Sequence, residues 1–378
     1  MTTLVVFFFL LATGWTLLGL LGIAVATRRP ERVASSVDAL PPVTVLKPLC
    51  GHDPSLQGNL ESFFLQSHPN YELVFGVEDP NDPAIVTVMR LAEKYPKVRS
   101  RIVCHSGLAA SNPKVRNLLG MMGHASHDLF VISDSNVRVD AHYLEELVRT
   151  RLETGAGIVT SVIAGTGETS LGGALESAQL NGFCATGACI PTLFGDAAVI
   201  GKSMLMSRKE LADLGGLSRV ADVLAEDFVL GKMFQHGGRP VVLARTIVQN
   251  VTGNVSIEAF FQRHRRWATL RWRLRPAAFV LEPLLNGVAL SLLAWTLSEP
   301  LLVFVPWAFG LCVARDVAGW VLLRGTRSLW IPVVVAPVRE GLSLAAWLIA
   351  PWKRRVTWRG HLMKLGAGTL LFRTAEQG

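Results

Sequence analysis

The stretch Leu-Phe-Val-Ile-Ser-Asp-Ser-Asn at positions 129–136 is an apolar run that ends in an acid and an amide. Similar apolar runs bounded by turn residues occupy positions 43–47, 71–77, 101–104 and 155–163. Segments with helical spacing occupy positions 56–66, 84–94 and 114–124. This alternation of short strands and helices predicts an α/β domain with a mainly parallel sheet.

Two aspartates follow successive predicted strands directly or within two residues. Asp134 comes after the strand at 129–133, and Asp79 comes after the strand at 71–77. Each one alone is explained equally by a turn or helix-capping role. Ligands of parallel sheets bind beyond the carboxyl ends of the strands, so their joint placement favours a shared ligand.

Further candidate residues lie at predicted helix starts. Lys114 and Asn117 belong to Asn-Pro-Lys-Val-Arg-Asn at 112–117, and a helix N-terminus favours phosphate. Glu226 and Asp227 lie in the first turn of another predicted helix, where acids are stabilised by the helix dipole alone. The functional alternative is that one of these two carboxylates is a general base. Residues 174–187 are predicted as a helix or a mobile segment that lines the site.

The first apolar stretch predicts a membrane anchor. Positions 4–26 carry no charge over 23 residues, and basic residues follow at 28, 29 and 32. That length crosses a hydrocarbon core of about 30 Å. The basic residues that follow place the N-terminus outside and the next domain in the cytoplasm. Five cysteines, an odd number without metal-ligand spacing, agree with a reduced compartment.

The C-terminal third is again strongly apolar, over positions 283–298, 301–323 and 329–352. Basic residues flank the last run on both sides, so we predict three spans plus a re-entrant segment bent at Pro337. The charged pairs Arg315/Asp316 and Arg339/Glu340 are expected to face protein or a cleft filled with headgroups.

An arginine-rich stretch at 258–275 precedes these apolar runs. It contains Arg263, Arg266 and Trp267, and its spacing predicts a cationic amphipathic helix in the headgroup layer. Such a helix is also explained by binding of anionic lipid alone. The net charge of +8 is concentrated at the edges of apolar segments, which favours lipid headgroups and donor phosphates over nucleic acid.

The expected organisation therefore has five parts. They are an N-terminal transmembrane anchor at 1–28, a cytoplasmic catalytic domain at 29–254, an interface helix at 255–279, a transmembrane and re-entrant region at 280–352, and a basic cytoplasmic tail at 353–378. The protein is thus expected to be an integral, multi-pass membrane protein.

The ordered set of motifs resembles the ceramide glucosyltransferases, which are inverting membrane enzymes with a GT-A nucleotide-sugar fold. The likeness covers nearly the whole chain and rests on the motifs at positions 46–51, 59–64, 77–84, 112–118, 134–136, 225–227, 263–267, 282–283, 339–340 and 357–360. The resemblance implies a Rossmann-like GT-A domain inserted between transmembrane helices.

The resemblance also implies a role for each matching residue. Asp79 falls on the uridine contact, and Asp134 on the diphosphate and divalent-metal site, for Mg²⁺ or Mn²⁺. Asp227 falls on the catalytic base, and Lys114 and Asn117 join the donor-binding set. The arginine-tryptophan motif falls on residues 263, 266 and 267, close to the leaving diphosphate and the acceptor.

Two departures from the pattern bear on these roles. The second acidic position of a usual GT-A metal motif is Asn136 here, which leaves one direct carboxylate ligand. The motif of polysaccharide synthases begins with Gln, whereas Arg263 takes that place here, and this argues against a processive synthase.

We therefore expect transfer of glucose from a UDP-sugar donor to ceramide at the bilayer surface. Two alternatives remain open at this stage. One is a related enzyme that transfers N-acetylglucosamine from its UDP-sugar to a hopanoid polyol, and the other is a non-catalytic membrane scaffold. The residues do not decide which UDP-sugar is the donor.

Overall fold

The computed structural model describes residues 2–28, 40–51, 53–106, 109–195, 198–358 and 361–373. The chain forms two compact units. The helical unit comprises Met1–Val25, Ala164–Ile190 and Thr252–Gly378, and the sheet unit comprises Ala26–Ile163 and Pro191–Val251. The segment 164–190 therefore packs with the apolar helices, although it lies between two parts of the sheet unit in the sequence.

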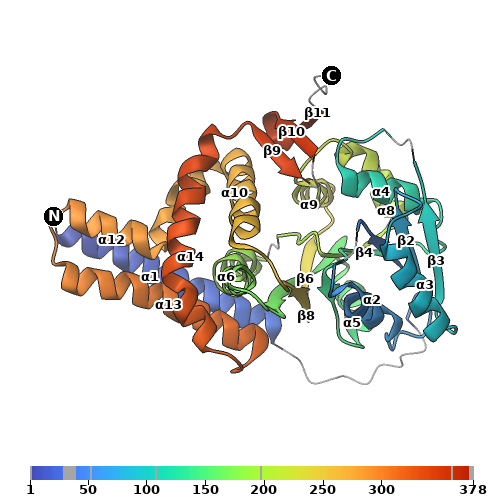
Figure 1. Ribbon diagram of the computed structural model, residues 1–378, viewed down its shortest axis with the longest axis horizontal. Helices are drawn as coiled ribbons and strands as arrows, with labels where there is room; N and C mark the ends of the chain where they lie inside the picture. Colours follow the sequence, from blue (N-terminus) through green and yellow to red (C-terminus); the bar gives the residue numbers. More distant parts are fainter. Residues whose placement is uncertain are drawn as a thin grey trace. The chain divides into compact units, whose positions relative to one another are not determined.

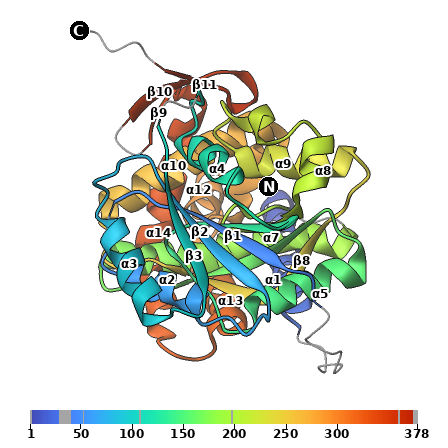
Figure 2. The same ribbon diagram turned by 90° about the vertical axis from the view of Figure 1, so that its right-hand side faces the viewer.

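The sheet unit is built on eight strands in the order β3-β2-β1-β4-β7-β6-β8-β5, of which the end of β6 enters the helical unit (Figure 1). The strands are β1 Val43–Pro48, β2 Tyr71–Val77, β3 Arg99–Cys104, β4 Leu129–Ser133, β5 Val137–Arg138, β6 Ile158–Thr166, β7 Ser203–Ser207 and β8 Val241–Val251. Strand β1 runs parallel to both neighbours, so that Val43 pairs with Tyr71 and with Leu129. Figure 2 shows β1, β2 and β3 side by side.

The expected parallel sheet is confirmed for β3, β2, β1 and β4. These strands are nearly continuous apolar runs because both faces of a parallel sheet are covered. The other half departs from the expectation, since β7 runs antiparallel to β4 and to β6. The predicted strands at 71–77 and 129–133 have the observed bounds, whereas the strand predicted at 155–163 is displaced to Ile158–Thr166.

Helices of the sheet unit follow its strands. They are α2 Leu56–Phe64, α3 Ala84–Lys94, α4 Pro113–Met122, α5 Tyr143–Thr154, α8 Arg208–Asp213 and α9 Glu226–His236. Helix α4 begins where the sequence predicts, because Asn112 Oδ1 accepts hydrogen bonds from the N–H groups of Lys114 and Val115 and Pro113 occupies the first turn. Helix α4 packs on β1 and β2.

The helical unit contains three helices that are long and apolar enough to cross a membrane, over Thr2–Thr27, Leu301–Arg324 and Trp330–Trp352. Its elements are α1 Thr2–Thr27, α6 Leu171–Gln179, a π-helical turn Leu180–Cys184, α7 Ala185–Cys189, α10 Ile257–Leu274, α11 Pro276–Leu281, α12 Gly287–Thr296, α13 Leu301–Arg324 and α14 Trp330–Ile349. The helical prediction for residues 174–187 is thus confirmed.

The predicted bend at Pro337 is wrong. Residues of α14 form one continuous helix that contains Pro337, and the sharp bend of 80° lies between Pro276–Leu285 and Gly287–Thr296. The chain breaks there because Asn286 leaves helical geometry and its side chain caps α12 at Ala289 N. The described residues, α1 included, therefore offer three candidate spans, or four if this bent pair is one span.

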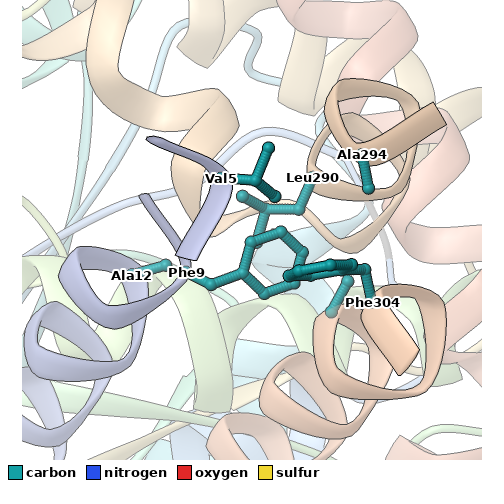
Figure 3. Packing of buried hydrophobic residues seen from close by; sticks show 7 residues of the cluster. Val5, Phe9, Ala12, Leu290, Ala294 and Phe304 are labelled. Carbon is teal, nitrogen blue, oxygen red and sulfur yellow. The ribbon is translucent and has the colours of Figure 1, made fainter. Parts of the chain in front are cut away.

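Aromatic packing joins the N-terminal helix to the C-terminal ones. Figure 3 shows Val5, Phe9 and Ala12 of α1 against Leu290, Ala294 and Phe304 of α12 and α13. The rings of Phe9 and Phe304 meet edge to face at 5.0 Å. Segments almost 300 residues apart in sequence therefore share one apolar core.

A four-residue ionic network, here called the arginine network, lies inside α13 and α14. Arg315 Nε lies 3.0 Å from Asp316 Oδ1, and Arg315 Nη2 lies 3.0 Å from Glu340 Oε1. Arg339 Nη2 reaches Asp316 Oδ2 at 2.7 Å and also pairs with Glu340. All four side chains are at least 98% buried, so the charged pairs face protein as expected.

The segment after α14, which is expected to be a basic tail, contains regular strands. Within the described residues, β9 Arg355–Trp358, β10 His361–Leu365 and β11 Leu371–Arg373 form a three-stranded antiparallel sheet. Alternating Val356, Met363, Leu365 and Leu371 are buried, which gives this hairpin-like segment an apolar face. The motif at 357–360 lies partly outside the described residues, and residues 29–39 and 374–378 lie wholly outside them.

Candidate active site

Asp134 lies just beyond the carboxyl end of β4 and is held between two lysines. Its Oδ1 is 2.9 Å from Lys114 Nζ, and its Oδ2 is 3.3 Å from Lys202 Nζ. Burial raises the pKa of Asp134, but the two ammonium groups outweigh burial and lower it below the ordinary value. Asp134 is therefore an anion, and about a quarter of its side chain stays exposed.

Lys202 Nζ lies between the two polar side chains of the Asp-Ser-Asn motif. It donates a 2.8 Å hydrogen bond to Asn136 Oδ1 in addition to its contact with Asp134. Asp134 Oδ2 and Asn136 Oδ1, which belong to residues separated by one position, thus contact the same ammonium group. Asn136 is itself fixed, because its Nδ2 donates to Asn250 Oδ1 of β8.

Lys114 connects this motif with the start of α9. Its Nζ lies 3.1 Å from Glu226 Oε1 and donates to the carbonyl oxygen of Gly201 at 2.8 Å. Glu226 is buried and also accepts from Asn112 Nδ2. Burial and the nearby Asp227 raise the pKa of Glu226, and Lys114 opposes the rise. Because Glu226 is buried between Lys114 and Asn112, it is a structural partner of the lysine.

Asp227 is the more open of the two acids at the start of α9, since it is half-buried and Glu226 is fully buried. Its Oδ2 accepts from Gly201 N at 3.0 Å, and its Oδ1 accepts from Phe228 N at 2.8 Å. A Cβ at position 201 would lie 2.6 Å from Asp227 Oδ2, so a side chain there would displace the carboxylate. We call Lys114, Asp134, Lys202, Glu226 and Asp227 the strand-end cluster.

Lys47, at the end of β1, contacts the backbone of the strand-end cluster. Its buried Nζ donates to the carbonyl oxygen of Asp134 at 2.6 Å and to Ser133 Oγ at 3.3 Å. It also lies 3.8 Å from the ring centroid of Phe63. Burial lowers the pKa of Lys47 well below its ordinary value. Lys47 therefore fixes the turn that carries Asp134.

Two residues of the predicted donor set have other contacts. Asp79 is exposed at the end of β2, where its Oδ1 accepts from Asn81 N in a turn. Asn117 is buried, and its Nδ2 donates to the carbonyl oxygens of Leu49 and Gly76. Neither side chain has a recorded contact with the strand-end cluster, and their donor-binding roles stay predictions.

The arginine-tryptophan motif lies on α10 in the helical unit, and Glu176 of α6 anchors it. Glu176 Oε1 lies 2.9 Å from Arg263 Nη1, and Oε2 lies 3.0 Å from His264 Nε2. The ring of His264 in turn meets that of Trp267 edge to face at 5.1 Å. Burial raises the pKa of Glu176, but His264 and Arg263 outweigh it and lower the pKa to about 2.

Arg266 borders a small cationic cleft, here called the basic cleft. Four basic residues line it without an acid, and the full lining is Gln262, Arg265, Arg266, Thr269, Lys353, Arg355 and Val356. Such a set suits an anionic group such as a phosphate. The motif residues on α10 therefore divide into an anchor, made by the partly exposed Arg263 and the buried His264, and a cationic surface around Arg266.

Sequence patterns missed Glu176, Gly201 and Lys202. All three lie in 155–202, a stretch rich in Gly, Ala and Thr without a strong period. Lys202 immediately precedes β7, and a basic residue next to a strand is a weak signal on its own. Glu176 is a buried acid in an apolar helix, which a buried cationic partner explains once the fold is known.

The residues at Asp134 and Asn136 fit a divalent cation. The described residues contain no group of three or more His, Cys, Asp or Glu side chains that could hold a metal. Mg²⁺, however, binds through one or two carboxylates and the phosphates of a substrate. The two oxygens already converge on one cation, the Lys202 ammonium, so both can face a positively charged ligand.

Comparison with known proteins agrees with this architecture. Ceramide glucosyltransferase 1 of Caenorhabditis elegans is 28% identical over 256 residues, which covers 67% of this chain and 55% of that protein. A ceramide glucosyltransferase of Candida albicans is 36% identical over 118 residues, or 28% of this chain and 22% of that one. The chain thus spans about half the length of the nematode relative.

A mannosyltransferase of Pyrobaculum calidifontis, solved in complex with GDP-Man and Mn²⁺, has a similar structure. It matches with a TM-score of 0.54 and 17% identity over 93% of this chain and 98% of that one. This likeness confirms the expected GT-A fold. The model of glycosyl transferase family 21 matches residues 4–371, and the chain therefore belongs to that family.

Proposed function

We propose that this protein transfers glucose from UDP-glucose to ceramide, with inversion at the anomeric carbon. Membership of family 21 and the likeness to ceramide glucosyltransferases support this reaction class. The observation that carries the proposal is the strand-end cluster, in which an open carboxylate, Asp227, lies one residue from the acid that holds Lys114. That lysine in turn contacts the acid of the Asp-Ser-Asn motif.

Asp227 is the proposed general base. Two backbone N–H groups orient its carboxylate, which takes the proton from the primary hydroxyl of ceramide. The hydroxyl oxygen then attacks the anomeric carbon on the face opposite the nucleotide. The bond from that carbon to the diphosphate oxygen breaks, and UDP leaves with the electron pair. The product carries glucose in the inverted configuration.

Basic side chains neutralise the charge that develops on the leaving diphosphate. Lys114 and Lys202 already hold the carboxylate of Asp134, and Arg266 lines the basic cleft. A divalent cation, Mg²⁺ or Mn²⁺, would be held by Asp134 and Asn136 and would supply further positive charge to the diphosphate. Asp79, Lys114 and Asn117 are the proposed donor-binding residues.

The three candidate spans support an acceptor that stays in the bilayer. We propose a multi-pass protein whose catalytic domain faces the cytoplasm, as the basic residues after α1 favour. The second candidate reaction is transfer of N-acetylglucosamine to a hopanoid polyol, because the same cluster could activate another lipid hydroxyl.

A donor and acceptor panel tests the proposal. The purified protein is given radiolabelled UDP-glucose, UDP-galactose, UDP-glucuronate or UDP-N-acetylglucosamine with ceramide or a hopanoid polyol, with and without EDTA. We expect label in the ceramide fraction from UDP-glucose, and loss of label with EDTA. Label in the hopanoid alone would support the second candidate reaction and refute the first. No label from any donor and acceptor pair would refute both reactions.

A further inference from the structure

The helical unit contains a small cavity of about 40 Å³, which has room for about three waters. It is formed by α6, the π-helical turn, α10, the Glu282–Leu285 turn, α12 and α14, whose main helices appear in Figure 1. Polar side chains on its wall are Gln179, Arg271, Glu282, Asn286, Arg339, Glu340 and Ser343. We call it the helical-unit cavity.

Two sequence motifs without a role in the proposed chemistry meet at this cavity. Glu282 and Pro283 belong to the first motif, and Arg339 and Glu340 belong to the second, which lies 56 residues later in the chain and on α14. A role in helix packing alone would explain Glu340, whose Oε2 accepts from Gly287 N at 2.8 Å. It does not explain why both motifs border the same space.

The charges on the cavity wall cancel. Its charged lining is two arginines and two glutamates, at positions 271, 339, 282 and 340. Arg271 binds Glu282 through two hydrogen bonds of 2.6 and 3.0 Å, and Arg339 pairs with Glu340. A neutral ligand with hydroxyl or amide groups suits such a wall, whereas the basic cleft, with four basic residues and no acid, suits an anion.

The wall keeps one hydrogen-bonding group unsatisfied. Arg339 Nε is buried and has no acceptor among the described residues, although Arg339 Nη1 donates to Gln179 Oε1 at 2.6 Å. The arginine is 1% exposed, so this N–H is closed to the cavity as well as to bulk solvent. Arg339 therefore fixes Gln179 and Glu340 on the wall, and the partly exposed Arg271 is the arginine that a ligand can reach.

The rest of the wall is apolar and belongs to the candidate membrane region. Phe183, Leu344 and Trp347 line the cavity, and Trp347 stacks on Phe279 of α11 at 5.4 Å. Leu344 and Trp347 lie on the candidate span Trp330–Trp352. A ligand with a polar head and a hydrocarbon chain therefore finds both kinds of surface at one place.

We propose that the helical-unit cavity binds the polar head of a neutral lipid acceptor that carries hydroxyl and amide groups. This inference rests on the proposed function, since it names where the acceptor of that reaction is held. Arg271, whose side chain is 37% exposed, would donate to an oxygen of the head, and Glu282 or Ser343 would accept from its amide proton or its secondary hydroxyl, which leaves the primary hydroxyl to react. The acyl chain would run along Leu344 and Trp347.

Photolabelling of the wild-type protein in nanodiscs tests the site directly. The probe is a ceramide with a diazirine next to its amide, and competitors are unlabelled ceramide, a hopanoid polyol and anionic phosphatidylserine. We expect label in peptides that contain residues 339–347 or 279–286, removed by ceramide and retained with phosphatidylserine. Removal by the polyol alone would identify a hydroxylated lipid without an amide and overturn the amide part of the assignment. Label elsewhere, or label that ceramide does not remove, would overturn the site.

A matched pair of substitutions tests its use. Leu344→Trp places a larger side chain in the cavity, and Leu348→Trp makes the same change one turn later at a half-exposed position outside it. We expect the KM for ceramide to rise at least tenfold in Leu344→Trp, with the KM for the donor and the KM values of Leu348→Trp within twofold of wild type. An unchanged ceramide KM in Leu344→Trp would refute the inference.

These outcomes separate the inference from the proposed function. If wild-type protein transfers no sugar to ceramide, the proposed function fails, and competed photolabelling still decides the cavity. If sugar transfer is normal, but the photolabel lies outside the cavity and Leu344→Trp leaves the KM for ceramide unchanged, the proposed function stands and the cavity assignment is refuted. Photolabelling also covers the case in which Leu344→Trp does not fold, because it needs no variant.

Discussion

The strand-end cluster and the arginine network both pair basic side chains with acids, but they are built for different tasks. The strand-end cluster uses two lysines, backbone N–H groups and acids of which Asp134 and Asp227 stay partly open. The arginine network uses two arginines, and all four of its charges are sealed inside helices. Lysine is a flexible point charge that can exchange partners, whereas the planar guanidinium holds several acceptors at once.

The partly open strand-end cluster is suited to binding a charged substrate, whereas the buried arginine network is suited to holding helices together. A partly open acid beside two lysines can receive a charged substrate without leaving an unpaired buried charge. A sealed network cannot release a partner, but it can hold Arg315 on α13 to Glu340 on α14 and to the carbonyl oxygen of Leu285 before α12.

The largest expected effect is loss of the base. Asp227→Asn keeps the shape of the side chain but cannot accept the acceptor proton, so kcat should fall by about 10²–10⁴-fold. UDP affinity should stay within threefold, because the substitution leaves Lys114 and Asp134 in place. Steady-state transfer and calorimetric UDP binding measure the two quantities. Asp213→Asn, at an exposed acid of α8, is the control. Turnover like wild type in folded Asp227→Asn would remove Asp227 from the role.

The next effect is on stability and belongs to the arginine network. Arg315→Met leaves Asp316 and Glu340 with one arginine between them, and breaking a buried pair costs about 3–5 kcal/mol. The double variant Arg315→Met with Glu340→Met removes one charge of each sign and should recover much of that loss. Thermal unfolding in detergent measures both. A single variant as stable as wild type would show that the network holds nothing together.

Glu176 gives a pH-dependent effect of similar size. Its pKa is lowered from the ordinary value of 4.5 to about 2 in the folded protein. Its contribution to the free energy of unfolding is therefore present above pH 4.5 and lost as the pH falls towards 2. The full contribution is on the order of 3 kcal/mol. Unfolding temperatures between pH 6 and 3 should fall more steeply for wild type than for Glu176→Gln. Parallel curves would contradict the anchoring of α10 by Glu176.

A glycine substitution sharpens the contrast within the strand-end cluster. Gly201→Ala places a methyl group 2.6 Å from Asp227 Oδ2 and displaces the carboxylate, which should lower kcat by up to about 100-fold. Gly123→Ala has no atom within 4 Å of the new methyl and is the matched control. Equal kcat values for the two variants would show that the position of Asp227 is not critical.

The smallest expected effect concerns the metal. Removal of Mg²⁺ or Mn²⁺ with EDTA should weaken UDP binding by about tenfold, since the lysines still neutralise part of the diphosphate charge. Asp134→Asn should make UDP binding insensitive to EDTA. Calorimetry with and without the metal checks this, and EDTA sensitivity that persists in Asp134→Asn would place the metal elsewhere.

The sequence predicts the parallel half of the fold well, because its strands carry a strong and local signal. The run at 129–136 predicts a strand at 129–133 followed by the acid Asp134, and the structure has both at these positions. Asn112 and Pro113 likewise set the start of α4 through local capping. Those features depend on neighbours within a few residues, which any sequence pattern contains.

The features that the sequence does not predict depend on distant partners. The pairing of Glu176 with Arg263 and His264 joins residues almost 90 positions apart. Pro337 stays inside a continuous helix, whereas the bend falls at Asn286, whose Nδ2 donates to the carbonyl oxygen of Glu340. Gly182 lets the π-helical turn approach Asp316 closely, and no local period reports that contact.

The anomeric configuration of the product tests whether the ceramide hydroxyl attacks the anomeric carbon directly. The protein in nanodiscs converts ceramide and UDP-glucose, and proton NMR of the isolated lipid gives the coupling at the anomeric position. Direct attack assisted by Asp227 predicts a β-linked product from the α-linked donor. An α-linked product, or no glucosylated ceramide at all, would contradict the account.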